Sequence, residues 1–382
     1  MQNMLWMFAI SVALLGYAYA GYPALIWLLA KARGRPAQKG EFSGGVSVLI
    51  AAHDEAAVLP RKLENLLELA RTEPIREIWI GLDGCTDGTG AVLPQPSTGN
   101  LQPRIQILEF KTRRGKAAVL NNLMAKAGQP IVVLMDARQR VEAGAISRLL
   151  ENFADARVGV VSGALVYESA AGGAQKGAES YWGYEKFIRG CESRFWAVPG
   201  ATGALYAIRR ELCAPIPENT LVDDVLIPMR AVLKGFRCLF EPSARVFDLP
   251  AARFDQEGLR KRRTLAGIWQ LWRLEPRIFS IWANPIGFQW FSHKFLRLLT
   301  PFFVLMALFS LGWMAWRNSG AFQVIFAVSV AAILTSFLAF WFGKRISSRA
   351  LGLLGAFFGV NWALLQAARD AWTGRFEPRW GR

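Results

Sequence analysis

Acidic side chains follow several short apolar runs in the N-terminal part of this 382-residue sequence. They are Asp54 and Glu55 after residues 46–51, Asp83 after residues 75–82, and Asp136 after residues 131–135. Short apolar runs of this kind predict buried parallel strands, and ligands on parallel sheets bind beyond the carboxyl ends of the strands. We therefore expect these carboxylates to lie together at a ligand-binding edge.

Two further features bear on the chemistry. In the segment LMDARQR, Arg138 stands two residues after Asp136, where a metal site would have a second carboxylate. The pair Asp223–Asp224 follows a polar stretch that predicts a helix start. Acids at this place usually cap the helix, but the positive end of a helix also helps to keep a carboxylate ionised, as a general base requires.

The elements that position these acids alternate between strands and helices. A further strand is predicted over residues 105–110, and helices are predicted over 60–70 and 117–127. Strands that alternate with helices predict an α/β fold with a mostly parallel sheet.

The composition indicates a membrane protein with a basic water-facing part. The chain is 53% hydrophobic, yet it carries a formal net charge of +16. Lysine and arginine cluster beside apolar runs, as over 31–39 and 344–349, which favours membrane lipid and argues against nucleic acid as the partner. The four scattered cysteines form no CxxC and only two histidines exist, which argues against a structural zinc and suits a reducing cytosol.

Hydropathy divides the chain into six regions. They are an N-terminal transmembrane helix (1–30), a basic linker (31–45), a cytoplasmic α/β domain (46–250), interfacial amphipathic helices (251–295), C-terminal transmembrane helices (296–370) and a basic tail (371–382). The basic flank after the first helix places the α/β domain inside. Three C-terminal crossings would put the basic tail outside, so either the last apolar segment does not cross or the charge rule fails here.

Five motifs in order resemble the family 2 glycosyltransferases, which have a GT-A fold. They are VSVLIAAHDEAAVL, IWIGLDGCTDGT, RRGKAAVLNNL, VVLMDARQR and the stretch from GATGALYAIRR to NTLVDDVLIPM, and the resemblance covers about residues 45–270. With flanking membrane helices, the chain is most similar to the polysaccharide-synthase branch, which includes hyaluronan and poly-N-acetylglucosamine synthases. The expected fold is a nucleotide-sugar-binding, Rossmann-like α/β domain between N-terminal and C-terminal transmembrane helices.

The resemblance implies which residues bind the donor. Asp83 would accept hydrogen bonds from the nucleotide base, and Glu55 would lie beside base and ribose. Lys116, in the Gly-Lys pair, would border the donor diphosphate. His53 is left open between a donor contact and a packed histidine.

The family pattern at Asp136 is Asp-x-Asp, which holds a divalent cation on the donor pyrophosphate. Three interpretations follow for this chain. Asp136 holds Mg²⁺ or Mn²⁺ alone with phosphate oxygens and water; or Arg138 supplies part of the charge that neutralises the diphosphate; or Arg138 points away and pairs with Glu142 as an i,i+4 helix partner.

The remaining site residues lie later in the chain. In the family the second acid of the pair is the general base, which assigns Asp224 with Asp223 beside it and implies inversion. Gly200, Thr202 and Gly203 would lie beside donor sugar and acceptor, and Trp196 would stack on a sugar or belong to the core. Processive relatives carry Gln-x-x-Arg-Trp near the end of the domain; here Arg263 matches the diphosphate-binding arginine, and Thr264 replaces the tryptophan of the acceptor platform.

The expected protein is a multi-pass enzyme of the inner (cytoplasmic) membrane. It would move a sugar from a nucleotide-sugar, expected to be a UDP-sugar, to a lipid-linked or glycan acceptor in envelope or exopolysaccharide synthesis. A processive synthase that exports its product is the alternative, although Thr264 weakens it. A membrane scaffold with a dead GT-A domain is the alternative of another class, and the presence together of Asp83, Asp136, Asp224 and Arg263 argues against it. The oligomeric state is not predicted.

Overall fold

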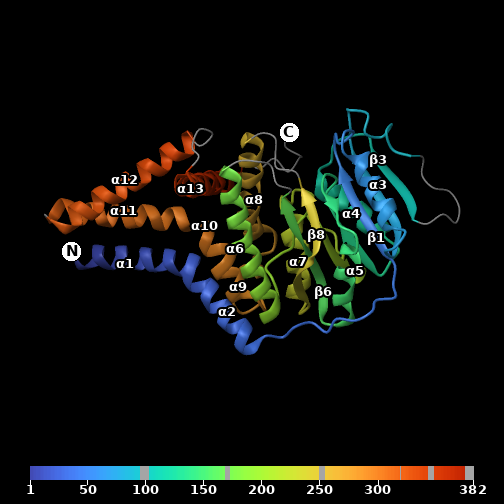
Figure 1. The fold of residues 1–382 in the computed structure, drawn as a ribbon, viewed down its shortest axis with the longest axis horizontal. Coiled ribbons are helices and arrows are strands. Elements are labelled where there is room, and N and C mark those ends of the chain that lie inside the picture. Colours follow the sequence, from blue (N-terminus) through green and yellow to red (C-terminus); the bar gives the residue numbers. More distant parts are fainter. Residues whose placement is uncertain (95–102, 168–172, 249–253, 319, 343–347, 375–382) are drawn as a thin grey trace.

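The computed structural model describes residues 1–94, 103–167, 173–248, 254–318, 320–342 and 348–374. Figure 1 shows an α/β domain at one end of the molecule and a group of long helices, α1, α11 and α12, extending from the other. Helices α6 and α8 stand between these two parts.

An eight-stranded sheet forms the centre of the α/β domain, in the order β3-β2-β1-β4-β7-β6-β8-β5. Its strands are β1 (Val46–Ala52), β2 (Ile75–Asp83), β3 (Arg104–Phe110), β4 (Ile131–Leu134), β5 (Arg140–Val141), β6 (Val158–Tyr167), β7 (Tyr206–Arg209) and β8 (Arg237–Asp248). The four strands β3, β2, β1 and β4 are parallel, and β7 is antiparallel to both of its neighbours. The mostly parallel sheet confirms the predicted fold class.

Helices cover both faces of this sheet because every residue of β1 is buried and both faces need apolar partners. The covering helices are α3 (Leu59–Leu69), α4 (Lys116–Lys126), α5 (Ala145–Leu150) and α7 (Asp223–Leu233). Leucines of α3 and α5 pack in one core with Ile50 and Val133, whereas α4 and α7 pack in another with Leu49 and Leu134. The carboxyl ends of β1, β2 and β4 therefore remain open for a site.

Four stretches of helix are long and apolar enough to cross a membrane: Gln2–Arg33, Thr300–Arg317, Ala321–Trp341 and Ala350–Thr373. The first comprises α1 (Gln2–Gly16), a π-helical turn (Tyr17–Gly21) and α2 (Tyr22–Arg33); the others are α11 (Thr300–Arg317), α12 (Ala321–Trp341) and α13 (Arg349–Thr373). Their outward surfaces are apolar, as at Trp6, Phe309 and Val328, which are 60%, 62% and 63% exposed. Side chains of this kind are stable facing lipid rather than water.

The predicted interfacial region 251–295 begins with one long helix, α8 (Phe254–Leu274), and continues in short pieces. These are two short turns (Pro276–Phe279 and Trp290–Phe295) around α9 (Gly287–Gln289), followed by α10 (Leu296–Leu298). Helix α8 reaches the core of the α/β domain through Ile268 and Leu271. Helix α6 (Gly173–Phe195) packs against α2 and β8.

Candidate active site

Lys116 lies between two carboxylates at the carboxyl ends of the strands. Its Nζ is 3.0 Å from Oδ1 of Asp136 and 3.3 Å from Oδ2 of Asp223. Asp136 follows β4, Asp223 begins α7 and Lys116 begins α4. Burial lowers the pKa of Lys116, but Asp136, Asp223 and Asp224 outweigh that effect and hold its pKa above the usual range. The lysine therefore stays charged and draws together acids that are far apart in the sequence.

Asp224 is held by the loop that contains the small residues. The Gly203 N–H donates to its Oδ2 at 3.0 Å, and the Ala201 N–H donates to its backbone oxygen at 2.8 Å. Burial, and then the neighbouring Asp223, raise the pKa of Asp224 to about 6. A carboxylate with this pKa is ionised at neutral pH and is still basic enough to accept a proton.

Gly203 stands at the point where the charged groups converge. A Cβ on this residue would lie 3.4 Å from Oδ2 of Asp224, 3.6 Å from Oδ2 of Asp136 and 3.7 Å from Nζ of Lys116. The missing side chain therefore leaves a small space enclosed by two acids and a cation. Such a space allows a reacting group to approach both carboxylates.

Asp83 is fully buried and binds the loop before α4. Its two oxygens accept hydrogen bonds from the backbone N–H groups of Arg114 at 2.6 Å and Gly115 at 2.8 Å. Gly115 has a φ of 97°, a conformation that favours glycine. These contacts fix the start of α4 and hence Lys116, while base recognition by Asp83 stays a prediction.

The segment after Asp136 does not form the helix that one interpretation required. It runs as a loop into β5, so i,i+4 spacing does not bring Arg138 to Glu142. Glu142 instead binds Arg148 at 2.9 Å and Arg245 at 2.7 Å, and the predicted Arg138–Glu142 pair is wrong. The Nε of Arg138 lies 3.8 Å from Oε1 of Glu55, and burial raises the pKa of Glu55. Arg138 thus remains at the rim of the site.

His53 lies on the same side as Glu55. Its Nδ1 is 2.7 Å from the backbone oxygen of Asp83, so the ring is engaged with the end of β2. This contact favours the packed-histidine alternative.

Arg263 reaches the acids from α8. Burial lowers the pKa of this guanidinium, although Asp223, Asp224 and Asp136 lie near enough to raise it. Its buried Nε has no hydrogen-bond partner among the described residues. A half-buried cation with a free donor beside three acids suits an anionic ligand such as a diphosphate. Thr264, one residue on, is exposed.

The ring of Trp196 packs between two guanidinium groups. Arg35 lies 5.6 Å and Arg237 5.2 Å from the ring centroid, and Arg237 also donates to the Trp196 backbone oxygen at 2.8 Å. This packing favours the core interpretation of Trp196 over sugar stacking.

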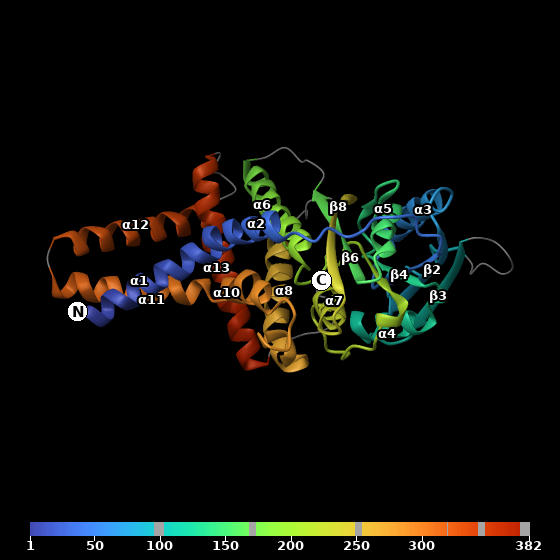
Figure 2. The ribbon, with the colours of Figure 1, turned by 90° about the horizontal axis from the view of Figure 1, so that it is seen from below.

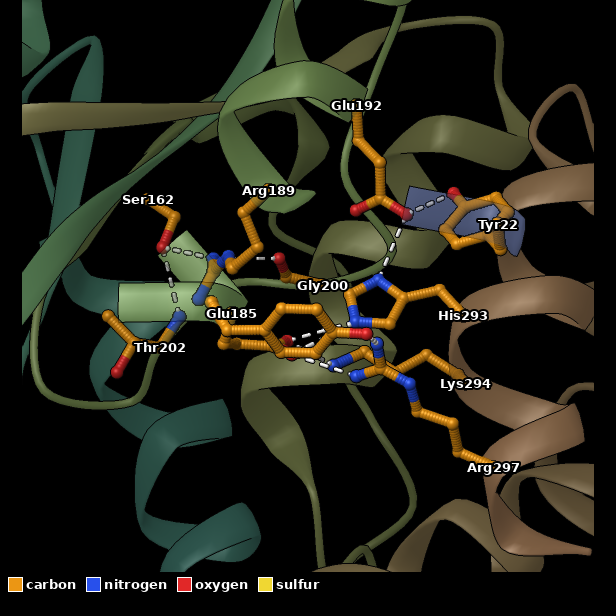
Figure 3. A network of polar contacts seen from close by, with 11 residues as sticks. Tyr22, Ser162, Glu185, Arg189, Glu192, Gly200, Thr202, His293, Lys294 and Arg297 are labelled. Atoms are coloured by element: carbon orange, nitrogen blue, oxygen red, sulfur yellow. Dashed lines mark hydrogen bonds and ion pairs between the residues drawn. The ribbon is translucent and has the colours of Figure 1, made fainter. Parts of the chain in front are cut away.

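Arg189 supports the small-residue loop, and the sequence analysis did not identify it. Figure 3 shows its guanidinium between Ser162 and Gly200. Its Nη2 donates to Ser162 Oγ at 2.8 Å and to the Gly200 oxygen at 3.3 Å, while Ser162 Oγ accepts the Thr202 N–H at 3.0 Å. Because Arg189 and Ser162 belong to α6 and β6, no local spacing links them to this loop.

Other side chains of α6 bind the membrane-proximal segments. Glu192 accepts a hydrogen bond from Tyr22 of α2 at 2.5 Å and contacts His293 at 2.9 Å. Glu185 contacts His293 at 3.1 Å, Arg297 at 3.1 Å and Lys294 at 3.5 Å (Figure 3). Helix α6 is therefore joined to the active-site loop by Arg189 and to the membrane-proximal helices by two buried glutamates.

Lys62 is a second residue that the sequence analysis did not identify. It is 3% exposed, and its Nζ donates to the Gln139 backbone oxygen at 2.7 Å, behind the Asp136 loop. Burial lowers its pKa to about 7, with Asp136 opposing the shift. The sequence gives one indication of this role, because Lys62 occupies an otherwise apolar position of the predicted helix 60–70.

Residues 47–216 match the family described as glycosyl transferase family 2. The chain carries a family 2 glycosyltransferase domain. The site above lies within this domain and in the segments that follow it, since Asp223, Asp224 and Arg263 come after residue 216.

Two curated relatives of this chain are beta-monoglucosyldiacylglycerol synthases. The protein from Nostoc sp. is 25% identical over 209 residues, which cover 52% of this chain and 44% of the relative. The protein from Synechocystis sp. is 25% identical over 152 residues, which cover 38% and 32%. The matches thus span less than half of the length of these relatives.

The chain is similar in fold to a solved mannosyltransferase from Pyrobaculum calidifontis, determined in complex with GDP-Man and Mn²⁺. The TM-score is 0.71 with 22% identity, and the alignment covers 97% of this chain and 99% of the other. The similarity includes the long helices as well as the sheet, and it confirms the GT-A fold with helices apolar enough to span a membrane at both ends.

Proposed function

We infer that this chain transfers a sugar with inversion from a nucleotide-sugar to a lipid acceptor at the membrane. One observation carries this proposal: Asp224, Asp136 and Lys116 converge around the space at Gly203. A base, an acid suited to a cation and a permanent positive charge are what inverting transfer from a diphosphate donor requires.

Each residue has a separate task in this reaction. Asp224 accepts the proton of the acceptor hydroxyl as that oxygen forms a bond to the anomeric carbon. The bond from the anomeric carbon to the diphosphate oxygen breaks on the opposite face, and Lys116 and Arg263 stabilise the charge on the leaving nucleoside diphosphate. The Gly203 N–H holds one oxygen of Asp224, which orients the other for the proton.

The residues present fit a divalent cation. Asp136 points an oxygen at the Nζ of Lys116, so this carboxylate already faces a positive charge. Mg²⁺ and Mn²⁺ accept carboxylate oxygens together with phosphate and water, and such an ion would neutralise charge on the donor diphosphate. The Mn²⁺ bound by the solved mannosyltransferase supports this proposal. Arg138, at the rim beside Glu55, is placed to assist rather than to replace the ion.

A lipid acceptor is favoured over a soluble one. The curated relatives are named for a glycolipid product, and α8, which carries Arg263, leads directly into the membrane-proximal helices. The basic flank of the first helix supports a catalytic domain on the cytoplasmic face of the inner membrane. Transfer of one or a few sugars is preferred over processive polymer synthesis, because Thr264 offers no aromatic surface on which a growing glycan could stack.

Release of nucleoside diphosphate by the purified protein in lipid tests the proposal. UDP- and GDP-sugars would each be supplied with diacylglycerol or with a polyprenyl phosphate. We expect turnover with at least one pair, and its loss in Asp224→Asn. Glu64→Gln, an exposed carboxylate on α3, is the matched control and should keep activity. No turnover with any donor would support the scaffold alternative instead, whereas equal turnover in Asp224→Asn would show that Asp224 is not the base.

A further inference from the structure

Helix α13 is long and apolar enough to cross a membrane, yet its contacts place both of its ends near the catalytic domain. The helix runs from Arg349 to Thr373 and follows α12, whose last turn lies at the end nearer the sheet (Figure 1). The question is on which side of the membrane α13 ends.

The first half of α13 packs on the end of α12 that is nearer the catalytic domain. A Cβ on Gly355 would come within 2.9 Å of the Ala339 and Phe340 backbone, and a Cβ on Gly359 within 2.7 Å of the Phe340 ring. Ala339 and Phe340 belong to the last turn of α12, which ends at Trp341. The two helices therefore meet at the C-terminal end of the membrane-spanning helix α12.

The second half of α13 binds α8 and the catalytic domain. Asp370 accepts two hydrogen bonds from Arg262 of α8, at 2.5 and 2.6 Å. Three residues earlier, Ala367 is fully buried against Ala266 of α8 and Leu221, which lies two residues before Asp223. These partners are fixed to the active site, because the Leu221 N–H donates to Gln270 of α8 at 3.0 Å.

A crossing helix could not make both sets of contacts. The 24 residues of this stretch span about 36 Å at 1.5 Å per residue, which is more than the thickness of a bilayer core. If α13 crossed, Asp370 would lie on the face opposite to the catalytic domain. Figure 2 shows α13 running across the ends of α11 and α12 beside α8, rather than along them.

The outward surface of α13 is apolar. It includes Leu353, Phe357 and Trp362, which are between 45% and 50% exposed. This surface continues from the apolar surface of α12, with which α13 is packed. In the sequence, basic residues occur near both ends of this helix, as expected at the boundary of anionic headgroups.

We propose that α13 lies along the membrane surface on the catalytic side, with its apolar face in lipid, and that only Gln2–Arg33, α11 and α12 cross. The chain then crosses three times among the described residues, which leaves the end of α13 on the same side as the basic linker 31–45; the basic tail from residue 375 onward lies outside the described residues. The conflict between hydropathy and charge in the sequence is thereby removed. The helix also becomes a lipid-bound support for α8 and for the segment that leads to Asp223.

Protease accessibility in sealed vesicles of both orientations tests this topology. A protease site with an epitope tag would be placed after Arg382, between Lys234 and Gly235 in an exposed turn of the catalytic domain, or between Asn318 and Ser319 after α11. We expect the first two sites to be cut in the same vesicle population and the third in the other. Cleavage of the site after Arg382 together with the site after Asn318 would overturn the proposal.

The Arg262–Asp370 contact gives a second measurement in the full-length chain. Arg262→Asp and Asp370→Arg should each lower the melting temperature in detergent, since each leaves like charges in contact. The double variant should recover most of the loss. Single variants without effect, or losses that simply add in the double variant, would show that Arg262 and Asp370 do not interact, which would refute the contact on which the inference rests independently of any catalytic assay.

Discussion

The pKa of Asp224 predicts an acidic limb in the pH profile of catalysis. With a pKa of about 6, its ionised fraction falls from about 90% at pH 7 to about 10% at pH 5. Because only the carboxylate accepts the acceptor proton, kcat/KM should fall about tenfold over this range. A divalent ion bound at Asp136 would offset one of the charges that raise this pKa, so the limb should lie at or slightly below pH 6.

Asp223 provides the perturbation that tests this assignment. After burial, its charge is the largest cause of the raised pKa of Asp224. Asp223→Asn removes that charge while keeping the shape, so the acidic limb should move to lower pH. The sign follows from repulsion: without a neighbouring negative charge, the Asp224 carboxylate loses its proton more readily.

The assay is nucleoside diphosphate release between pH 4.5 and 8 at low donor concentration, so that it reports kcat/KM. Circular dichroism at each pH would show that the chain stays folded. A profile that is flat across this range, or a limb that does not move in Asp223→Asn, would refute the assignment of Asp224 as the base.

Three other predictions concern the surroundings of the base. Asp136→Ala should abolish turnover and the metal dependence of donor binding, and chelation should abolish wild-type turnover until Mg²⁺ or Mn²⁺ is restored; a chelator without effect, with Arg138→Ala inactive, would transfer the charge role to Arg138. Arg189→Ala should lower kcat by about 10- to 100-fold with little change in donor KM, because the loop that holds Asp224 loses its support, and a proportional rise in KM alone would contradict this. Products analysed by mass spectrometry should carry one or a few sugars, and long polymer from the purified enzyme would show that Thr264 does not limit processivity.

The first half of the domain could be predicted closely from the sequence. The apolar runs 46–51, 75–82, 105–110 and 131–135 correspond to β1 to β4, and the helices expected over 60–70 and 117–127 correspond to α3 and α4. These elements are local: their patterns are set by burial of one strand or one helix face.

What could not be predicted depends on contacts between distant segments. The antiparallel β7 lies between β4 and β6, although β5, β6 and several helices separate it from β4 in the sequence. Arg138 was placed by helical spacing in a segment that forms a loop and a strand. Hydropathy indicates that α13 is apolar, but only its contacts with Arg262 and Leu221 indicate how it is oriented relative to the membrane.

The buried glutamates of α6 limit which fragments of the protein can fold. Glu192 and Glu185 are 0% and 8% exposed, and their partners are Tyr22, His293, Lys294 and Arg297, which belong to the segments on either side of the catalytic domain in the sequence. A soluble fragment without those segments would leave Glu192 without its hydrogen-bond partners and Glu185 without the cations Lys294 and Arg297, and removing one partner of a buried ion pair typically costs roughly 3–5 kcal/mol. The catalytic domain is therefore not a detachable module: the membrane-proximal segments complete its interior, and expression trials should keep both.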